Sequence, residues 1–384
     1  MLAETGFLLS TGILLFAYPV TWLVTRPLSV GSESPPDRDP DPAPHFTILV
    51  PAYNEEAVIR QKLQNFKELR YPPDRLDMVI VSDQSNDATD SLVRELGGDR
   101  VRLVNYGERL GKTRILNRTV PELAGEIVIQ TDANVLFDPS AIRAFARWYS
   151  DPRIGLVCGY EERSVPPGGD AIRTETTYRD FEVRIKMLQS RFGAVMGAHG
   201  GLYSIRKACW QPLPDNALSN DDLLTAMNVL RQGHRVVMDS SARALEITGT
   251  RLGEEFRRRV RIGAGNYQVF WWHSWLLNPL QGWKSFFFYA HKLPRWFTPH
   301  LMLVSLACNI LLADRGPGYL ALLVLQLLFY GIALLGAVLD ALKIQGGLLM
   351  APWHFCSMNL AVLVGFFKWL GGIRSSTWTP GSRR

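Results

Sequence analysis

The stretch Ile127-Val128-Ile129-Gln130-Thr131-Asp132 decides the fold class, because an almost wholly apolar run ends in an acidic residue. A short apolar run bounded by turn signals is typical of a buried strand. A carboxylate is costly to bury, so an acid at the carboxyl end of such a strand usually faces a crevice and a ligand. Asp132 is therefore the first candidate site residue.

The same pattern recurs upstream, where Val79-Ile80-Val81-Ser82-Asp83 also ends in an acid. From His45 onwards, apolar runs alternate with helical periodicity, which predicts an α/β fold with a mostly parallel sheet and helices on both faces. Ligands bind outside the carboxyl ends of the strands in such sheets. The predicted strands are Phe46–Pro51, Asp77–Ser82, Arg102–Asn105, Glu126–Thr131, Ile154–Gly159 and Arg235–Asp239, and the predicted helices are Glu55–Leu69 and Asp87–Leu96 (N-caps Asn54 and Asn86), Pro139–Ser150 and Asp221–Arg231.

Asp132-Ala133-Asn134 provides two oxygen ligands at alternate positions. Alternate side chains point the same way from an extended backbone. Asp132 and Asn134 therefore form a candidate site for Mg²⁺ or Mn²⁺ together with a diphosphate, and the ion would neutralise charge on a departing diphosphate. An ordinary Asx turn is the structural alternative.

Asp221-Asp222 places two carboxylates at a predicted helix start after a Gly-rich turn. The helix dipole favours their ionised form. One carboxylate can cap the helix while the other acts as a base on an incoming hydroxyl, and attack opposite the leaving group would invert the anomeric carbon. Capping by both residues is the structural alternative.

Four further stretches are candidate ligand contacts. Val50–Glu56 leads from a strand into a helix that already begins with acids, so contact with a nucleoside is favoured over phosphate binding. No Gly-x-Gly-x-x-Gly follows this strand, which counts against a dinucleotide-dependent dehydrogenase. Asp83 can accept hydrogen bonds from a base or ribose, and Lys112 at a helix start opposes the helix dipole and so needs another purpose. The glycines of His199-Gly200-Gly201 allow an acceptor to approach the backbone.

Four apolar runs approach or reach the length of a membrane span, namely Phe7–Val24, Phe297–Ala313, Tyr319–Leu339 and Leu348–Leu370. Residues 1–30 are predicted to form an N-terminal anchor rather than a signal peptide, because the start is not basic. The region from His45 to about Trp296 would then lie in the cytosol. The Arg-containing tail would fall outside the cell, against the positive-inside tendency, so either the tail breaks that rule or one run does not cross.

The charge distribution favours a membrane over a nucleic acid as the partner. The net charge is +6, and much of the excess lies in Arg251–Arg261 beside the predicted spans. The four cysteines have no metal-like spacing, which fits a reduced compartment. The predicted organisation is an anchor at 1–30, a Pro-rich linker at 31–44, a cytosolic catalytic domain at 45–250, interfacial amphipathic helices at 251–296, about three membrane helices at 297–372 and a tail at 373–384.

These motifs together resemble the membrane-embedded family 2 glycosyltransferases, which include cellulose, chitin, hyaluronan and poly-N-acetylglucosamine synthases. The resemblance covers about residues 46–296, and it rests on the order of Val50–Glu56, Asp83, Gly111-Lys112, Asp132-Ala133-Asn134, Gly200-Gly201, Asp221-Asp222 and Arg258-Arg259-Val260-Arg261. It implies a GT-A fold, a UDP-sugar donor and a location in the cytoplasmic membrane.

The resemblance also implies a role for each matching residue. Asp222 would be the catalytic base, and Asp132 and Asn134 the metal site. The donor would contact Ala52, Tyr53, Glu55, Asp83, Lys112, Asp132, Arg258 and Arg261, and the acceptor would contact His199, Gly200, Gly201, Asp221 and Trp271.

Two departures from the family pattern bear on the acceptor and the metal. Ile262 stands where the family has a Trp that helps hold the acceptor sugar, for which Tyr267, Trp271 or Trp272 could substitute, and Asn134 replaces an Asp. The leading prediction is an inverting, metal-dependent transferase that passes a sugar from a UDP-sugar to a glycan or lipid-linked acceptor, including processive synthesis of a polysaccharide. The alternatives are transfer of one sugar to a membrane lipid (ceramide, diacylglycerol or polyprenyl phosphate) and a non-catalytic nucleotide-binding membrane scaffold. With about four spans, a polymer pore would be small or would need a second subunit.

Overall fold

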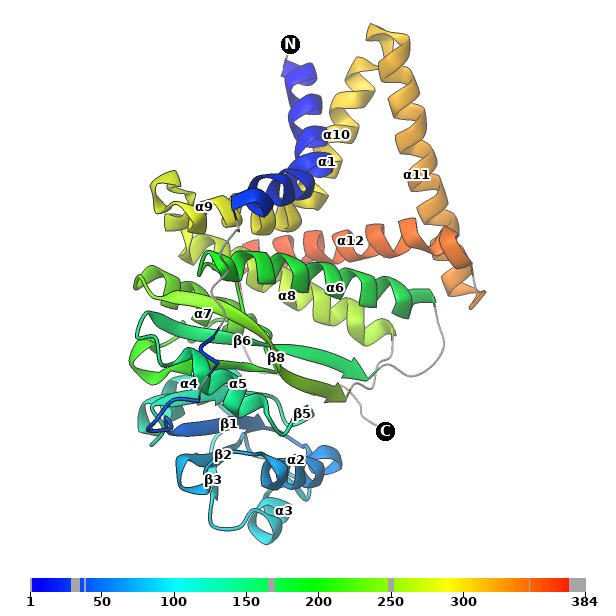
Figure 1. The fold of residues 1–384 in the computed structure, drawn as a ribbon. Helices are drawn as coiled ribbons and strands as arrows, with labels where there is room; N and C mark the ends of the chain where they lie inside the picture. Colours follow the sequence, from blue (N-terminus) through cyan, green and yellow to red (C-terminus); the bar gives the residue numbers. More distant parts are fainter. Residues whose placement is uncertain are drawn as a thin grey trace. The chain divides into compact units, whose positions relative to one another are not determined.

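The computed structural model describes residues 2–28, 35–37, 39–164, 170–247, 252–344 and 346–372. The chain divides into two compact units (Figure 1). The sheet unit comprises residues 31–165, 183–251 and 373–384, and the helical unit comprises residues 1–30, 166–182 and 252–372. The predicted tail at 373–384 and part of the predicted linker lie outside the described residues.

An eight-stranded sheet with the order β3-β2-β1-β4-β7-β6-β8-β5 forms the centre of the sheet unit. β3, β2, β1 and β4 run parallel, β7 is antiparallel to both of its neighbours, and β5 is antiparallel to β8. The predicted mostly parallel α/β sheet is confirmed. The strands are β1 (Phe46–Ala52), β2 (Leu76–Ser82), β3 (Val101–Asn105), β4 (Ile127–Gln130), β5 (Val135–Phe137), β6 (Ile154–Ser164), β7 (Tyr203–Arg206) and β8 (Arg235–Ile247).

The helices of this unit bury one face against the sheet. On α2 (Glu56–Glu68), Ile59, Leu63 and Phe66 recur at helical spacing and are at most 2 % exposed. They join the core under β1 and β2. The other helices of the unit are α3 (Thr89–Leu96), α4 (Lys112–Thr119), α5 (Ala141–Trp148) and α7 (Asp221–Arg231), and α6 (Asp170–Arg191) extends from the helical unit into the sheet unit.

The helical unit consists of long helices with exposed apolar surfaces. In the part of the chain that the structure describes, three helical segments are long and apolar enough to cross a membrane, namely Trp283–Arg315, Pro317–Ala341 and Gly347–Leu370. They coincide with the three apolar runs predicted after residue 296. The first predicted run lies in α1 (Leu2–Leu28), where two segments bent by 53° would form a fourth span if they act as one. The remaining helices are α8 (Leu252–Trp272), α9 (Trp283–Phe287), α10 (Leu293–Leu312), α11 (Pro317–Ala341) and α12 (Met350–Leu370).

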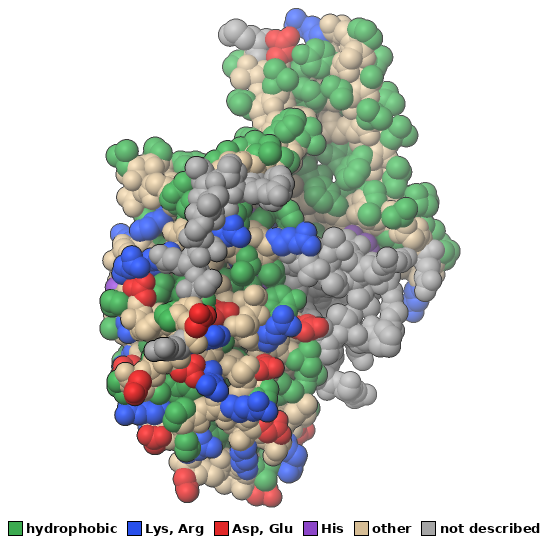
Figure 2. All heavy atoms as spheres, viewed as in Figure 1, with side chains coloured by type: hydrophobic (Ala, Val, Ile, Leu, Met, Phe, Trp, Pro, Cys, Tyr) green, Lys and Arg blue, Asp and Glu red, His purple; other side chains and the backbone are tan. Residues whose placement is uncertain are grey.

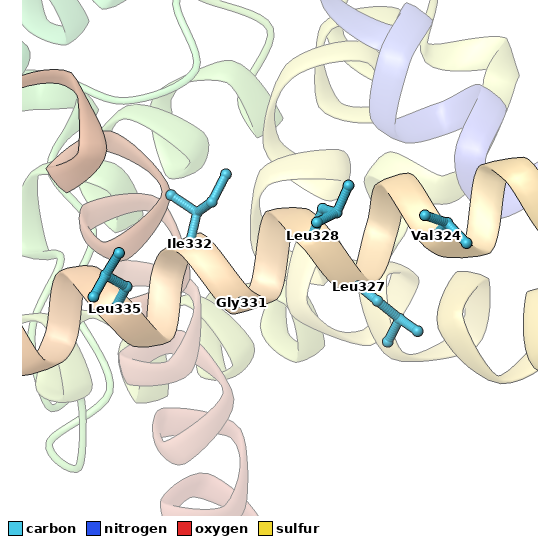
Figure 3. A pocket seen from close by; sticks show the side chains of 6 residues that line it. All are labelled: Val324, Leu327, Leu328, Gly331, Ile332 and Leu335. Carbon is cyan, nitrogen blue, oxygen red and sulfur yellow. The ribbon is translucent and has the colours of Figure 1, made fainter.

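The surfaces of these helices suit an apolar environment. Figure 2 shows hydrophobic side chains gathered over the long helices. Val324, Leu328, Ile332 and Leu335 line an apolar hollow along α11, together with Leu327 and Gly331 (Figure 3). Within the same unit α12 packs closely on α8. A Cβ at Gly365 would lie only 2.7 Å from the backbone of Ala264, so only glycine permits this approach. Contiguous exposed apolar surface of this extent is typical of membrane contact.

Candidate active site

The site lies where the parallel strands end. Ala52 at the end of β1 pairs with Ser82 at the end of β2, and Leu49 pairs with Gln130 at the end of β4. The register therefore brings the loops after these three strands to one edge of the sheet. Asp83 and Asp132 lie in two of those loops, as predicted. Ala52 is buried in the core, and its carbonyl accepts a hydrogen bond from Asp83 N at 2.8 Å.

Asp83 holds a neighbouring loop in place. Its two carboxylate oxygens accept hydrogen bonds from Leu110 N at 2.6 Å and from Gly111 N at 3.0 Å, and the residue is only 2 % exposed. Gly111 has a φ of +78°, a conformation that glycine adopts at little cost. This carboxylate therefore fixes the backbone directly before Lys112.

Arg109, in the same loop, covers the ring of Tyr53. The guanidinium carbon is 3.4 Å from the ring centroid, and its Nε is 3.9 Å from Asp83 Oδ2. Such cation–π stacking fixes both side chains. Tyr53 was a predicted donor contact, and Arg109 was not predicted.

The loops after β1 and β2 are fastened to each other. Asn54 Oδ1 accepts from Asn86 N at 2.9 Å, and Asp87 Oδ2 accepts from Glu56 N at 3.1 Å. Glu55 is 3 % exposed, and its backbone N–H donates to Thr89 Oγ1 at 2.8 Å. The predicted N-caps Asn54 and Asn86 are wrong, because Glu55 and Ala88 occupy the cap positions and both asparagines bridge the loops instead.

Lys112 joins two of the predicted acids at the first turn of α4. Its Nζ is 3.0 Å from Asp132 Oδ1 and 3.2 Å from Asp221 Oδ2. Burial alone would lower the pKa of Lys112, but the carboxylates of Asp132 and Asp221 outweigh it and raise the pKa above its ordinary value. The ammonium therefore stays charged and links the loop after β4 to the start of α7.

Asp222 lies beside Gly200. A Cβ at Gly200 would be 3.7 Å from Asp222 Oδ2, an ordinary contact distance, so the backbone of the glycine loop lies next to this carboxylate. Burial and then the adjacent Asp221 carboxylate raise the pKa of Asp222 to about 6. A carboxylate with a pKa near the working pH can accept a proton from a substrate hydroxyl. The N-cap of α7 is Asn220, so both Asp221 and Asp222 lie in the first turn rather than at the cap.

The turn after β4 presents one exposed and one buried candidate ligand. The side chain of Asp132 is 47 % exposed, whereas Asn134 is 5 % exposed. Asn134 Nδ2 donates to Ile247 O at 3.0 Å, which leaves its Oδ1 as the ligand atom. Within the described residues no group of three or more His, Cys, Asp or Glu side chains could hold a metal ion. A metal here would therefore take further ligands from a substrate.

Glu161 on β6 is a site residue that sequence reasoning missed. Its Oε2 accepts from Gly201 N at 3.0 Å, and a Cβ at Gly201 would lie 2.3 Å from the same oxygen. Gly201 is therefore required for this close approach. His199 Nδ1 is 2.9 Å from Gly159 O, so the predicted acceptor loop is fastened to β6 at two points. A buried acid in a strand gives no distinct signal in the sequence.

Three predicted site residues belong to the helical unit. Arg258 and Arg261 lie on α8 and are partly exposed, and Trp271 near the end of α8 is 67 % exposed. Tyr267 is 1 % exposed and its hydroxyl donates to Trp296 O at 2.6 Å. Of the residues that could replace the missing Trp at 262, Tyr267 is thus buried in its own unit, whereas Trp271 is available at the surface.

Comparisons with known proteins agree with this geometry. Residues 42–265 match the family described as "Glycosyltransferase like family 2". The chain belongs to this glycosyltransferase family. The match contains the sheet edge and every predicted site residue except Trp271.

Relatives and solved structures support the same assignment. The chain is 25 % identical over 271 residues to the "Poly-beta-1,6-N-acetyl-D-glucosamine synthase" of Staphylococcus aureus, covering 66 % of this chain and 65 % of that protein. It is 38 % identical over 98 residues to a "Probable glycosyltransferase" of Bacillus subtilis, covering 24 % of this chain and 23 % of that protein. A mannosyltransferase from Pyrobaculum calidifontis, solved in complex with GDP-Man and Mn²⁺, superposes with a TM-score of 0.71 at 24 % identity, covering 96 % of this chain and 97 % of that one.

The last comparison confirms the fold of this glycosyltransferase. The chain spans about 65 % of the length of the curated synthase, so that protein's whole activity does not carry over by similarity alone. The predicted family and fold class are confirmed by the family match and the structural likeness.

Proposed function

We propose that this glycosyltransferase is an inverting, metal-dependent enzyme of the cytoplasmic membrane that transfers a sugar from a UDP-sugar to a glycan or lipid-linked acceptor. The observation that carries the proposal is the convergence of Asp132, Asp221 and Lys112, with Asp222 next to Asp221. Acidic side chains at a strand-end edge can hold a metal-bound diphosphate, and Lys112 would add a positive charge for the same diphosphate.

The residues at the turn after β4 fit a divalent ion. The side chain of Asp132 is 47 % exposed, so an ion can reach it, and Lys112 beside it adds positive charge for a diphosphate. Mg²⁺ and Mn²⁺ bind through one or two protein oxygens and complete their shell with substrate phosphates. Asp132 and the Oδ1 of Asn134 would hold the ion, which would offset the charge of the diphosphate. Lys112 and, by their family positions, Arg258 and Arg261 would contact the diphosphate, and Tyr53, Glu55 and Asp83 would surround the nucleoside.

Asp222 acts as the base in this proposal. Its carboxylate takes the proton of the acceptor hydroxyl while that oxygen forms a bond to the anomeric carbon of the donor. The bond from this carbon to the diphosphate breaks on the opposite face, and the diphosphate leaves with the electron pair, so the anomeric configuration inverts. Gly200 lies next to Asp222, where the acceptor hydroxyl would approach.

The test is a donor screen on the purified full chain in detergent with Mn²⁺ or Mg²⁺. We expect release of UDP from one of a set of UDP-hexoses and UDP-N-acetylhexosamines, and GDP-mannose belongs in the set because the structural neighbour was solved with GDP-Man. Release of no nucleoside diphosphate from any donor, despite UDP binding, would support the non-catalytic scaffold instead.

Transfer of one sugar to a membrane lipid is a second candidate. Ile262 on α8 replaces the expected Trp, and Tyr267 is buried, so fewer aromatic side chains are available to hold a growing glycan. Product size separates the two candidates: a ladder of oligosaccharides supports a polysaccharide synthase, and a single glycolipid supports lipid transfer.

A further inference from the structure

Lys62 is a buried cation that the mechanism above does not use. It lies on α2 between Ile59 and Leu63, on the face that packs against the sheet, and it is 1 % exposed. Burying an ammonium is costly, and an apolar side chain would suit this face better. The lysine therefore needs a reason to be there.

The contacts of Lys62 lie on both sides of the candidate metal turn. Its Nζ donates to Thr131 Oγ1 at 3.3 Å, directly before Asp132, and to the carbonyl oxygen of Val135, directly after Asn134. Thr131 Oγ1 donates onward to Asp132 O at 3.3 Å. One side chain thus fastens both ends of the turn to α2.

The rest of the turn is held by backbone contacts to two strands. Thr131 N donates to Leu49 O on β1 at 3.2 Å, and Ile247 N on β8 donates to Asn134 O at 2.9 Å. Lys62 adds the support from the helix layer. Burial lowers the pKa of Lys62 to about 7, while the Asp132 carboxylate opposes this fall, so the two groups interact electrostatically.

We propose that Lys62 is a positioning residue of the glycosyl-transfer site, which holds the turn 131–135 so that Asp132 and Asn134 present their oxygens to a metal-bound diphosphate. The inference rests on the proposed function. Partners that support metal ligands from behind typically contribute a factor of about 10–100 to metal affinity or activity.

The matched control is Asn65, one turn further along α2. Its amide clamps the backbone of Phe137 with two hydrogen bonds, Nδ2 to Phe137 O at 2.8 Å and Phe137 N to Oδ1 at 2.7 Å. Asn65→Leu removes a half-buried helix-to-sheet clamp but does not touch the turn. A purely structural role of Lys62 would make both variants behave alike.

The experiment titrates Mn²⁺ into the full-length protein at fixed UDP and follows UDP binding, in parallel with the Mn²⁺ dependence of turnover. Lys62→Met should raise the half-saturating Mn²⁺ about tenfold, Lys62→Gln, which retains a donor, should raise it less, and Asn65→Leu should leave it unchanged. Thermal melting of each variant reports folding.

A wild-type Mn²⁺ requirement in folded Lys62→Met, or equal shifts in Lys62→Met and Asn65→Leu, would overturn the inference and leave the proposed function intact. The same holds if both Lys62 variants fail to fold while Asn65→Leu folds, because the lysine would then be only structural. Wild-type protein that binds UDP with Mn²⁺ but transfers no sugar would refute the proposed function, and the binding titration would still decide the role of Lys62. Wild-type protein that does not bind UDP with Mn²⁺ would overturn both.

Discussion

The carboxylates at the two ends of the same sheet edge have different surroundings. At the proposed nucleoside end, formed by Tyr53, Asp83, Arg109 and Gly111, the Asp83 carboxylate is buried and both of its oxygens accept backbone hydrogen bonds. At the proposed diphosphate end, formed by Lys112, Asp132, Asp221 and Asp222, three carboxylates gather around one lysine.

This difference suggests separate roles for the two ends: the carboxylate at the nucleoside end supports the loop structure, and the carboxylates at the diphosphate end are proposed to take part in the reaction. The Asp83 carboxylate is buried and accepts one backbone hydrogen bond on each oxygen, so it shapes the loop that carries Lys112. The Asp222 carboxylate differs, because burial and the adjacent Asp221 carboxylate raise its pKa to about 6 and so let it take up a proton. Substitutions at the diphosphate end should therefore change turnover, and substitutions at the nucleoside end should change stability and donor affinity.

The largest effect is expected for Asp222→Asn. The amide fills the same space but cannot accept the proton of the acceptor hydroxyl, so kcat should fall about 10³-fold. UDP binding should remain close to wild type, because Asp222 is not among the proposed donor contacts. Steady-state kinetics and UDP binding on the same preparation measure both quantities.

The control for this prediction is Asp215→Asn. Asp215 lies on the loop before α7 with its side chain 67 % exposed, and its loss should leave kcat unchanged. Wild-type turnover in Asp222→Asn would show that Asp222 is not the base. It would also contradict the proposed difference in role between the two ends of the sheet edge.

The pH dependence provides the next sharpest test. Burial and the adjacent Asp221 carboxylate raise the pKa of Asp222 to about 6. Below that pH the base is protonated, so kcat/KM should fall about tenfold for each further pH unit. Lys186, whose Nζ donates to Ala198 O at 3.1 Å, lowers this pKa, so Lys186→Met should move the acid limb to higher pH. A flat profile from about pH 5 to 8 would contradict the assignment.

Most residues of the diphosphate end could be predicted from the sequence. Apolar strands that end in Asp83 and Asp132 predict where the acids lie, because parallel strands end at one edge of a sheet. The acid pair at the start of α7 fits the helix dipole, whereas Lys112 at the start of α4 opposes it, and each was singled out on that ground. The structure places Lys112 Nζ 3.2 Å from Asp221 Oδ2.

The remaining contacts depend on pairings that are distant in the chain. β5 and β7 have three and four residues, too few to show an alternation of apolar and polar side chains in the sequence. They form because they pair with β8 and β4. Glu161 gains its role only when β6 passes the loop at Gly201. Lys62 does have a local signal, since it lies three residues after Ile59 and four before Phe66 on the buried face of α2.

A smaller effect on turnover, with a clear effect on stability, is expected for Asp83→Asn. The amide offers one acceptor where two backbone donors converge, and one buried N–H loses its partner, which should lower the free energy of unfolding by about 1–3 kcal/mol. The donor KM should rise because the loop before Lys112 loosens, while kcat changes less. Denaturant unfolding and donor kinetics test this, with Asp74→Asn, whose side chain is 75 % exposed, as the neutral control. A large loss of kcat without loss of stability would place Asp83 in the chemistry instead.

The smallest effect is expected for Arg109→Lys. Lysine keeps the charge near Asp83 but loses the planar group that stacks on Tyr53 at 3.4 Å from the ring centroid. Loss of about 0.5–1 kcal/mol of stacking should raise the donor KM by roughly two- to fivefold and leave kcat unchanged. Arg118→Lys removes a comparable stack on Tyr106, at 4.1 Å from the centroid, between α4 and the start of the loop after β3, and should leave the donor KM unchanged. If both substitutions shifted the donor KM equally, the stack at Tyr53 would have no special link to the donor. If Arg109→Lys lowered kcat as strongly as Asp222→Asn, the nucleoside end would take part in the reaction itself.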